Sequence, residues 1–176
     1  AKAWNIAKFT DRRFSPRDAD LAPVTAGLED QEPGGLPDLQ PLRTPNAPET
    51  RLPSVLLITE EDCRPEDFAP DTLTLRGAAT LSASHLRSPR TVAEGVSAFE
   101  DGALADAAAR AAPGADTLRA GVPADLARWA DRAGATQIVT PYVPQGPLRD
   151  WLDEAAPALA AEGIRLAEWR RDWDGL

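Results

Sequence analysis

The stretch that decides the fold is Ala135-Thr136-Gln137-Ile138-Val139-Thr140-Pro141-Tyr142. Its apolar, β-branched centre predicts a buried strand over residues 137–140. A helical pattern with Leu126 and Trp129 on its apolar face precedes the strand, and Gly134 is a favourable residue for ending that helix. A proline-bracketed loop, a second helix and a last apolar strand come after it. These flanking elements are predicted at residues 124–133, 141–147, 148–162 and 164–169.

A strand of different character lies upstream, at residues 54–58. This continuous apolar run (Ser-Val-Leu-Leu-Ile) follows Pro53 and is typical of a central parallel strand with both faces buried. The acidic group Glu60-Glu61-Asp62 comes directly after it, at the strand end where open α/β sheets bind ligands. The polar residues that continue to Asp67 favour the other interpretation, that these carboxylates belong to a solvated loop.

A long amphipathic helix is predicted over residues 91–112. Gly95 and Gly102 weaken it, because glycine is a poor helix former, and we expect the helix to break near Asp101-Gly102. The predicted apolar stripe of this helix comprises Val92, Val96, Phe99, Leu104, Ala107 and Ala108.

Two short strands complete the pattern, at residues 73–79 and 117–120. From residue 54 onward the predicted order is therefore β, β, α, β, α, β, α, β. Helices that alternate with apolar strands imply a parallel sheet with right-handed crossovers. The predicted fold class is α/β, a Rossmann-like parallel sheet of about five strands flanked by helices and preceded by a Pro-rich linker.

Two segments precede this domain, which is predicted to span residues 54–176. Residues 1–14 are basic and aromatic, and Trp4, Ala7 and Lys8 share one face of a predicted short helix. This segment is interpreted either as the end of a preceding helical domain or as a frayed N-terminal arm. Residues 15–53 contain eight prolines, which predicts an extended linker. A plain interdomain connection is favoured over a PxxP-type recognition segment at Pro37–Pro48.

The composition excludes several kinds of protein. The net charge of −9 and the presence of only two lysines argue against a free-standing nucleic-acid-binding domain, because phosphate contacts need clustered basic residues. A single cysteine and a single histidine exclude most zinc and haem sites, so no metal is expected. The longest apolar runs are too short to span a bilayer and no signal pattern is present, which predicts a cytoplasmic protein without membrane contact. Because the chain has no methionine and begins with Ala1, we expect it to be a fragment of a larger protein.

The sequence carries no catalytic signature. The G-x-G-x-x-G and Walker phosphate loops, the G-x-S-x-G elbow and the HExxH zinc motif do not occur. His85 lies in a Ser-rich loop with no cysteine or carboxylate beside it in sequence, so a surface or capping role is favoured over catalysis. Trp151, Trp169 and Trp173 suit either flavin or base stacking or ordinary packing, and packing is favoured.

A set of short motifs resembles the antenna-type α/β domain of DNA photolyases and cryptochromes. In that family a strand ending in a Gly-x-Pro step precedes a helix, which is followed by Gly-Ala and an apolar strand. The resemblance covers residues 54–176. Its motifs are Leu118 to Pro123, Leu126, Trp129-Ala130, Gly134 to Thr136, Tyr142-x-Pro144, Arg149-Asp150 and Gly163-Ile164.

Asn5 to Thr10, together with Arg13-Phe14, resembles the end of the flavin-binding helical domain of photolyase-like bacterial flavoproteins. The two resemblances imply a parent protein in which the α/β domain follows the flavin domain. Such a parent would bind FAD and act in light-driven DNA repair, as a photolyase-type lyase, or in blue-light sensing. The partner of the present chain would be the upstream helical flavin-binding domain, and DNA would be contacted only through the parent. The chain alone is expected to be non-catalytic and to hold no cofactor.

Four residues are candidates for cofactor binding by their position after the strand at 137–140: Thr140, Tyr142, Gln145 and Arg149. The alternative for all four is a role in the loop or in helix capping. In the family an Arg-rich turn usually follows the first strand, whereas here Glu60-Glu61-Asp62 follow it, which argues against an antenna chromophore.

Two other functions remain open from the sequence. One is a non-catalytic α/β interaction or scaffold module, suggested by the absence of catalytic motifs and by the Arg/Trp-rich end at residues 169–173. The other is a nucleotide-binding protein of the universal-stress type. We rank it last, because no glycine-rich phosphate loop is present.

Overall fold

The computed structural model of the chain describes residues 2–21 and 43–174, so the central part of the predicted linker lies outside the described residues. The chain divides into two compact units, residues 1–41 and 42–176. The first unit contains helix α1 (Ala3–Phe9), which confirms the predicted short helix, and a 3-10 turn, η1 (Asp18–Asp20). The side chains of Trp4 and Phe9 are exposed on this unit.

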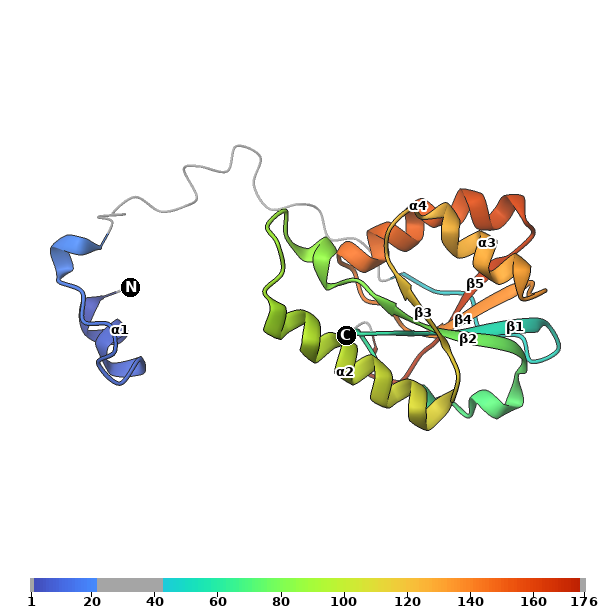
Figure 1. Cartoon of the computed structure of the whole chain (residues 1–176), viewed down its shortest axis with the longest axis horizontal. Coiled ribbons are helices and arrows are strands. Elements are labelled where there is room, and N and C mark those ends of the chain that lie inside the picture. The colour runs from blue at the N-terminus through green and yellow to red at the C-terminus, as the bar shows by residue number, and fades with distance from the viewer. Residues whose placement is uncertain (1, 22–42, 175–176) are drawn as a thin grey trace. The chain divides into compact units, whose positions relative to one another are not determined.

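The second unit is built on a five-stranded, all-parallel sheet with the strand order β3-β2-β1-β4-β5 (Figure 1). The predicted α/β, Rossmann-like fold class is therefore confirmed. The strands lie within one or two residues of the predicted positions, except that the second strand continues three residues further. Their bounds are β1 Pro53–Thr59, β2 Thr74–Ser82, β3 Asp116–Arg119, β4 Gln137–Pro141 and β5 Arg165–Trp169.

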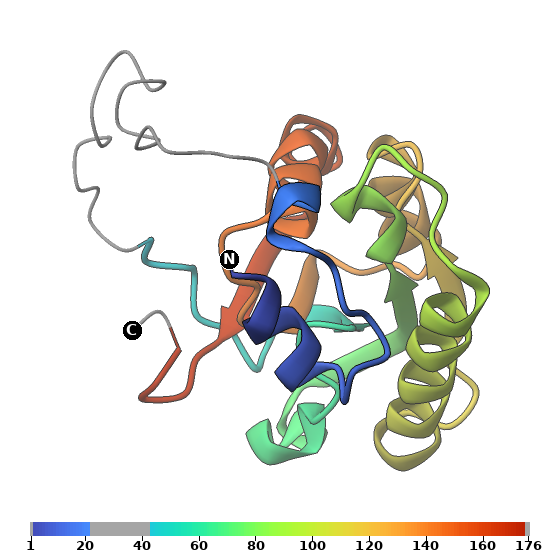
Figure 2. The same cartoon turned by 90° about the vertical axis from the view of Figure 1, so that its left-hand side faces the viewer.

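Helices cover both faces of the sheet. Helix α2 (Glu94–Ala111) lies on one face, and helices α3 (Ala124–Arg132) and α4 (Pro147–Ala161) lie on the other (Figures 1 and 2). This arrangement follows from right-handed crossovers. The chain moves from β1 to β3 in one direction across the sheet and then back to β4 and β5 in the other direction. The helices that follow β3 therefore lie on the face opposite to α2. Three short 3-10 helices complete the unit: η3 (Pro65–Phe68), η4 (Pro70–Thr72) and η5 (Ser84–Arg87).

Strand β1 is the centre of the core. Residues 55–59 are fully buried, as the apolar run predicts for a central parallel strand. Side chains alternate along the strand, so Val55 and Leu57 pack into the core under α3 and α4, whereas Leu56 and Ile58 pack against Leu104 of α2. Each of these side chains stabilises the fold by about 1.5–3 kcal/mol through burial.

Helix α2 differs from the prediction in two ways. The expected break near Asp101-Gly102 is wrong, because one continuous helix spans Glu94–Ala111. The first half of the predicted apolar stripe is also wrong, since Val96 and Phe99 are 52% and 79% exposed. The inward position at that turn is held instead by Glu100, which shares the buried face with Leu104 and Ala107. Packing of this face against the sheet compensates for the low helix propensity of Gly102.

The last part of the Pro-rich stretch belongs to the α/β unit. Residues 43–50, here called the strap, run beside the edge strand β5 (Figure 2). The backbone N–H of Glu168 donates to the Asn46 carbonyl at 2.8 Å, and the Asn46 side chain donates to the Leu166 carbonyl at 3.2 Å. The buried Gln137 side chain exchanges hydrogen bonds with the backbone of Glu49 at 2.9 and 3.1 Å. Hydrogen bonds therefore hold the strap along the edge of the sheet.

Candidate functional site

The strand order locates the place where a ligand site is expected. Strands β1, β2 and β3 extend in one direction from the centre, and β4 and β5 extend in the other, so the order reverses between β1 and β4. Open α/β sheets bind ligands outside the carboxyl ends of their strands at such a reversal. Strand β1 ends at Thr59 and is followed by Glu60, and strand β4 ends at Pro141 and is followed by Tyr142.

Glu60 is the most unusual group at this edge. Its side chain is only 9% exposed, and neither carboxylate oxygen has a hydrogen-bond partner among the described residues. The guanidinium of Arg87 lies 3.5 Å from Oε1. The pKa of Glu60 is raised to about 7, chiefly by burial and in smaller part by the nearby Glu100 carboxylate, while Arg87 opposes the shift. Glu60 thus holds a proton over part of the neutral pH range.

The interpretation of residues 60–62 as a solvated loop is therefore wrong for Glu60. It is also wrong for Asp62, whose largely buried side chain forms an ion pair with Arg171. The physical reason is that a chain leaving a central strand stays between the helical layers for another residue or two. The polar residues that follow in sequence gave no indication of this burial.

Glu100 joins helix α2 to the segment that leaves β2. One carboxylate oxygen accepts hydrogen bonds from the backbone N–H groups of Ala83 and Ser84 at 2.7 and 2.9 Å, and the other accepts one from the Ser84 hydroxyl. Burial opposes ionisation of this carboxyl, but the hydrogen bonds from Ser84 and Ala83 outweigh it and lower the pKa of Glu100. Glu100 is therefore an ionised structural group, and its charge contributes to the raised pKa of Glu60.

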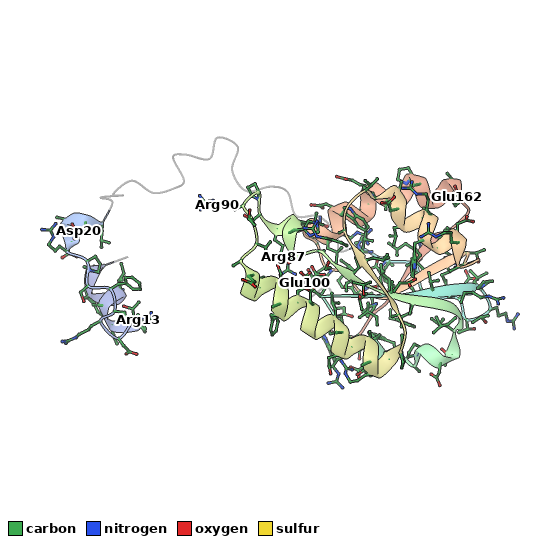
Figure 3. All side chains as sticks on the ribbon, viewed as in Figure 1. Arg13, Asp20, Arg87, Arg90, Glu100 and Glu162 are labelled. Carbon is green, nitrogen blue, oxygen red and sulfur yellow. The ribbon has the colours of Figure 1, made fainter. Side chains whose placement is uncertain are left out.

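Helix η5 is anchored on three sides. Ser84 binds Glu100 of α2, and the imidazole Nε2 of His85 lies 2.7 Å from the Ala120 carbonyl after β3. Arg87 donates to Glu61 at 3.0 Å, beyond the end of β1. Figure 3 labels Arg87 and Glu100 near the amino-terminal end of α2. His85 is half-buried and makes no hydrogen bond to a serine or cysteine among the described residues, so its geometry is that of a structural contact.

A polar cavity of about 520 Å³ opens beside η5. Its walls are the carboxyl ends of β2 and β3, the loop that follows η5 and the first turns of α2, so it also lies at the carboxyl edge of the sheet. This volume is within the range of small-molecule sites. Hydroxyl and charged side chains line it, including those of Ser82, Ser97, Arg90, Arg119, Glu100 and Asp101.

The structure gives the four sequence-predicted site residues different surroundings. Thr140 is fully buried, and its hydroxyl has no hydrogen-bond partner among the described residues. Thr59 of the neighbouring strand has the same property. Side chains two residues apart in a strand point to the same face of the sheet. Thr59 therefore lies on the same face as Val55, and Thr140 on the same face as Ile138, which is the face covered by α3 and α4. A buried hydroxyl without a protein partner is a place for a bound water or ligand atom.

The Tyr142 ring lies against two cations, with the guanidinium carbons of Arg43 and Arg170 at 5.0 and 5.7 Å from the ring centroid. Gln145 is exposed and donates to Asp150 at 3.2 Å. Arg149 is buried and directed to Glu168 at 2.9 Å and to Asp153 at 2.7 Å. Thr140 and Tyr142 thus lie at the end of β4, whereas the charge of Arg149 is neutralised by carboxylates of the domain itself.

The partners of Arg149 were not predicted from the sequence. Glu168 accepts hydrogen bonds from Arg43, Arg149 and the backbone N–H of Val143, and Arg43 lies 125 residues away in the chain. The only available signal was a glutamate in the middle of an otherwise apolar strand, which requires a buried partner if the strand is covered. The role of these residues is to join the strap, β4, α4 and β5.

Of the three tryptophans considered for stacking, Trp151 and Trp169 pack, as the favoured interpretation predicts, and Trp173 does not. Trp151 is buried and its Nε1 donates to the Gly121 carbonyl at 2.8 Å, and Trp169 stacks on Phe68 with ring centroids 5.3 Å apart. Trp173 is exposed. In the part of the chain that the structure describes, no three His, Cys, Asp or Glu residues are grouped so that they could hold a metal ion. Across residues 2–21 and 43–174, no helix has the length and apolar character that a bilayer crossing requires.

This edge of the sheet therefore offers binding chemistry: a buried acid, unpartnered hydroxyls and a polar cavity. Comparison with known proteins adds no relative, since no family model, no curated protein and no solved structure matches the chain.

Proposed function

We propose that residues 42–176 form the non-catalytic α/β domain of a cytoplasmic, photolyase- or cryptochrome-like flavoprotein. In this proposal the parent protein binds FAD in an upstream helical domain and uses it for light-driven DNA repair or blue-light sensing. The domain described here is the partner of that helical domain and contacts DNA only through the parent. The basis is the resemblance of its short motifs to the antenna-type domain, including Tyr142-x-Pro144 and Arg149-Asp150.

One observation supports the proposal: several motif positions lie at the connections between strands and helices of a Rossmann-like parallel sheet. The Gly121-Val122-Pro123 step joins β3 to α3, and its Gly121 carbonyl accepts the hydrogen bond from Trp151 of α4. Gly134, with φ of 68°, ends α3, and Gly163, with φ of 66°, ends α4, both in the left-handed region that favours glycine. These three motif positions therefore have a defined structural task in this α/β sheet.

The test is the absorption spectrum and mass of the full-length parent purified from its source. We expect flavin bands near those of bound FAD and release of FAD on denaturation. A repair assay on damaged DNA, with and without blue light, then separates a photolyase from a sensor. A correctly folded parent that contains no flavin would rule the proposal out.

A second candidate, an interaction or scaffold module, has its own observation. The outer face of α2 exposes the apolar side chains of Val96 and Phe99. Gly102, one turn later in the helix, has no side chain. Exposed apolar groups on a helix are typical of surfaces that bind other proteins. Pull-down of the upstream helical domain by the present chain, with Phe99→Ser as the variant, tests it. Binding that is lost in the variant favours the module, and a monomeric chain that captures nothing contradicts it.

A further inference from the structure

Two carboxylates compete for one arginine beyond the end of β1. The guanidinium of Arg87 lies 3.0 Å from a carboxylate oxygen of Glu61 and 3.5 Å from one of Glu60. The first distance is that of a hydrogen bond, whereas the second is that of a looser ion pair. The side chain of Glu60 is also the more deeply buried, at 9% exposed against 27% for Glu61. Arg87 therefore binds Glu61 in this structure and leaves the buried acid without a close partner.

The surroundings of Glu60 make its protonation state important for Arg87. Glu60 is faced by Glu61 on its own segment, by Glu100 on α2 and by the guanidinium of Arg87 on η5. Cys63 is also nearby, and burial raises the pKa of its thiol, which keeps it neutral near pH 7. A buried carboxyl needs a cation when it ionises and has no such need while it is protonated. Because the pKa of Glu60 is raised to about 7, both states occur in the neutral range.

Arg87 is the last residue of η5, so its position fixes the carboxyl end of this short helix. The other anchors of η5, Ser84 and His85, are at its start. After Arg87 the chain enters the largely exposed loop of residues 88–93, which leads to α2. The contacts of Arg87 therefore decide how firmly the end of η5 and this loop are attached to β1.

We propose that Glu60, Glu61 and Arg87 form a proton-controlled clasp on η5. When Glu60 is protonated, the more exposed Glu61 alone holds Arg87, and the end of η5 opens readily. When Glu60 is ionised, the guanidinium closes the gap of 3.5 Å, binds both carboxylates and fixes the end of η5 against β1. Residues of η5 and of the following loop line the polar cavity, so the clasp also controls how firmly one wall of that cavity is held.

The clasp has a signature that an ordinary structural ion pair lacks. Folding raises the pKa of Glu60, so the stability of the whole domain falls as the pH rises through 7. The same ionisation strengthens the attachment of η5, because it gives Arg87 a second carboxylate. Global stability and the local stability of η5 therefore change in opposite directions between pH 6 and pH 8.

Amide hydrogen exchange of the whole chain at pH 6 and pH 8 tests this inference. Protection is measured as the factor by which exchange is slower than in an unstructured peptide at the same pH. The Leu86 N–H reports on η5, because it donates to the Ala83 carbonyl at 2.9 Å. The Leu57 N–H, in the fully buried part of β1, reports on global unfolding. From pH 6 to pH 8 we expect protection of Leu86 to rise about fivefold, as a partly exposed ion pair provides, and protection of Leu57 to fall.

Three variants separate the clasp from other causes. Glu60→Gln has no charge to gain, so protection of Leu86 should no longer rise with pH. Arg87→Gln should also abolish the rise, and the carboxyl carbon of Glu60, followed by NMR, should titrate at a higher pH than in the unsubstituted protein. Arg90→Gln is the matched control, because the Arg90 side chain extends away from the domain (Figure 3). This variant should keep the full rise at Leu86.

Two results would overturn the proposal. One is protection of Leu86 that fails to rise between pH 6 and pH 8, since η5 would then not be held more firmly by ionised Glu60. The other is a rise that persists in Glu60→Gln, which would assign the effect to another group, such as His85 in the same helix. The inference does not depend on the parent being a light-driven flavoprotein.

Discussion

Arg149 of α4 and Glu168 of β5 form an ion pair of 2.9 Å in which the side chains are only 4% and 3% exposed. Glu168 has a second cation, Arg43 of the strap, at 2.7 Å, and a backbone hydrogen bond from Val143 at 3.0 Å. Such a buried carboxylate is compatible with a stable fold only while its partners are present, because an uncompensated buried charge is strongly unfavourable. The pair thus couples the helix, the edge strand and the strap.

Arg149→Met should lower the free energy of unfolding by about 2–3 kcal/mol. The loss stays below that of a completely unpaired buried charge because Arg43 still neutralises Glu168. Urea denaturation followed by circular dichroism measures it. Asp153→Asn is the control: it removes the other, exposed partner of Arg149, and should change stability by less than about 0.5 kcal/mol. Equal stabilities for Arg149→Met and Asp153→Asn would contradict a structural role for the buried pair.

Glu60→Gln should make the protein more stable at pH 8 and leave its stability unchanged at pH 4. Burial raises the pKa of Glu60 to about 7 from an ordinary value of 4.5, so the folded state binds this proton more tightly than the unfolded state does. The stability that Glu60 contributes is therefore full below about pH 4.5 and falls as the pH rises through 7. The variant avoids this loss and should gain up to about 2 kcal/mol, a value reduced by Arg87 and residual solvent access.

Thermal unfolding between pH 4 and pH 8 measures this difference. Glu61→Gln, at the more exposed neighbouring carboxylate that also binds Arg87, is the comparison that separates burial of Glu60 from the loss of a carboxylate beside Arg87. A constant difference between Glu60→Gln and the unsubstituted protein at every pH would show that folding does not change the pKa of Glu60, and would contradict the raised value.

Leu104→Ala should cost about 2–4 kcal/mol of stability, whereas Phe99→Ala should be neutral within about 0.5 kcal/mol. Both residues are large and apolar on the same helix, but Leu104 is buried against β1 and Phe99 is 79% exposed. Chemical denaturation of the two variants gives the comparison. A large loss in Phe99→Ala would show that another part of the protein covers this face of α2.

Gln137→Met should destabilise the domain by about 1–3 kcal/mol, since a buried hydrogen-bonding group is lost while its partners remain. The Gln137 amide donates to the Ser54 hydroxyl at 2.8 Å and exchanges two hydrogen bonds with the backbone of Glu49. Amide hydrogen exchange should accelerate first at Glu49, whose N–H loses its acceptor. Unchanged exchange at Glu49 would show that the strap is held without Gln137.

Local pattern was sufficient to predict the strands and helices. The apolar run at 54–58 and the β-branched run at 137–140 gave β1 and β4, because strands buried on both faces need such residues. The inward face of α2 was not predictable. Val96 and Phe99 fit a helical apolar stripe better than Glu100 does, and only the backbone N–H groups of Ala83 and Ser84, which come from another element, explain a buried glutamate there.

The candidate site was predictable in location but not in composition. The end of β4 was expected from the general rule for α/β sheets, and Thr140 and Tyr142 lie there. The acid at the end of β1 and the cavity beside η5 depend on the strand order, which brings β1 between β2 and β4. Right-handed crossovers restrict that order but do not select one, so residues such as Glu60 and Arg119 could not be combined from the sequence alone.

The strap has a practical consequence for producing this domain. A polypeptide that starts at Ser54, the boundary predicted from the sequence, lacks Arg43, Asn46 and Glu49. The outer backbone groups of β5 would then be free to pair with a strand of another molecule, and such open edges lead to aggregation. A polypeptide that starts before Arg43 keeps this edge capped and should remain monodisperse in solution at concentrations where the shorter one precipitates.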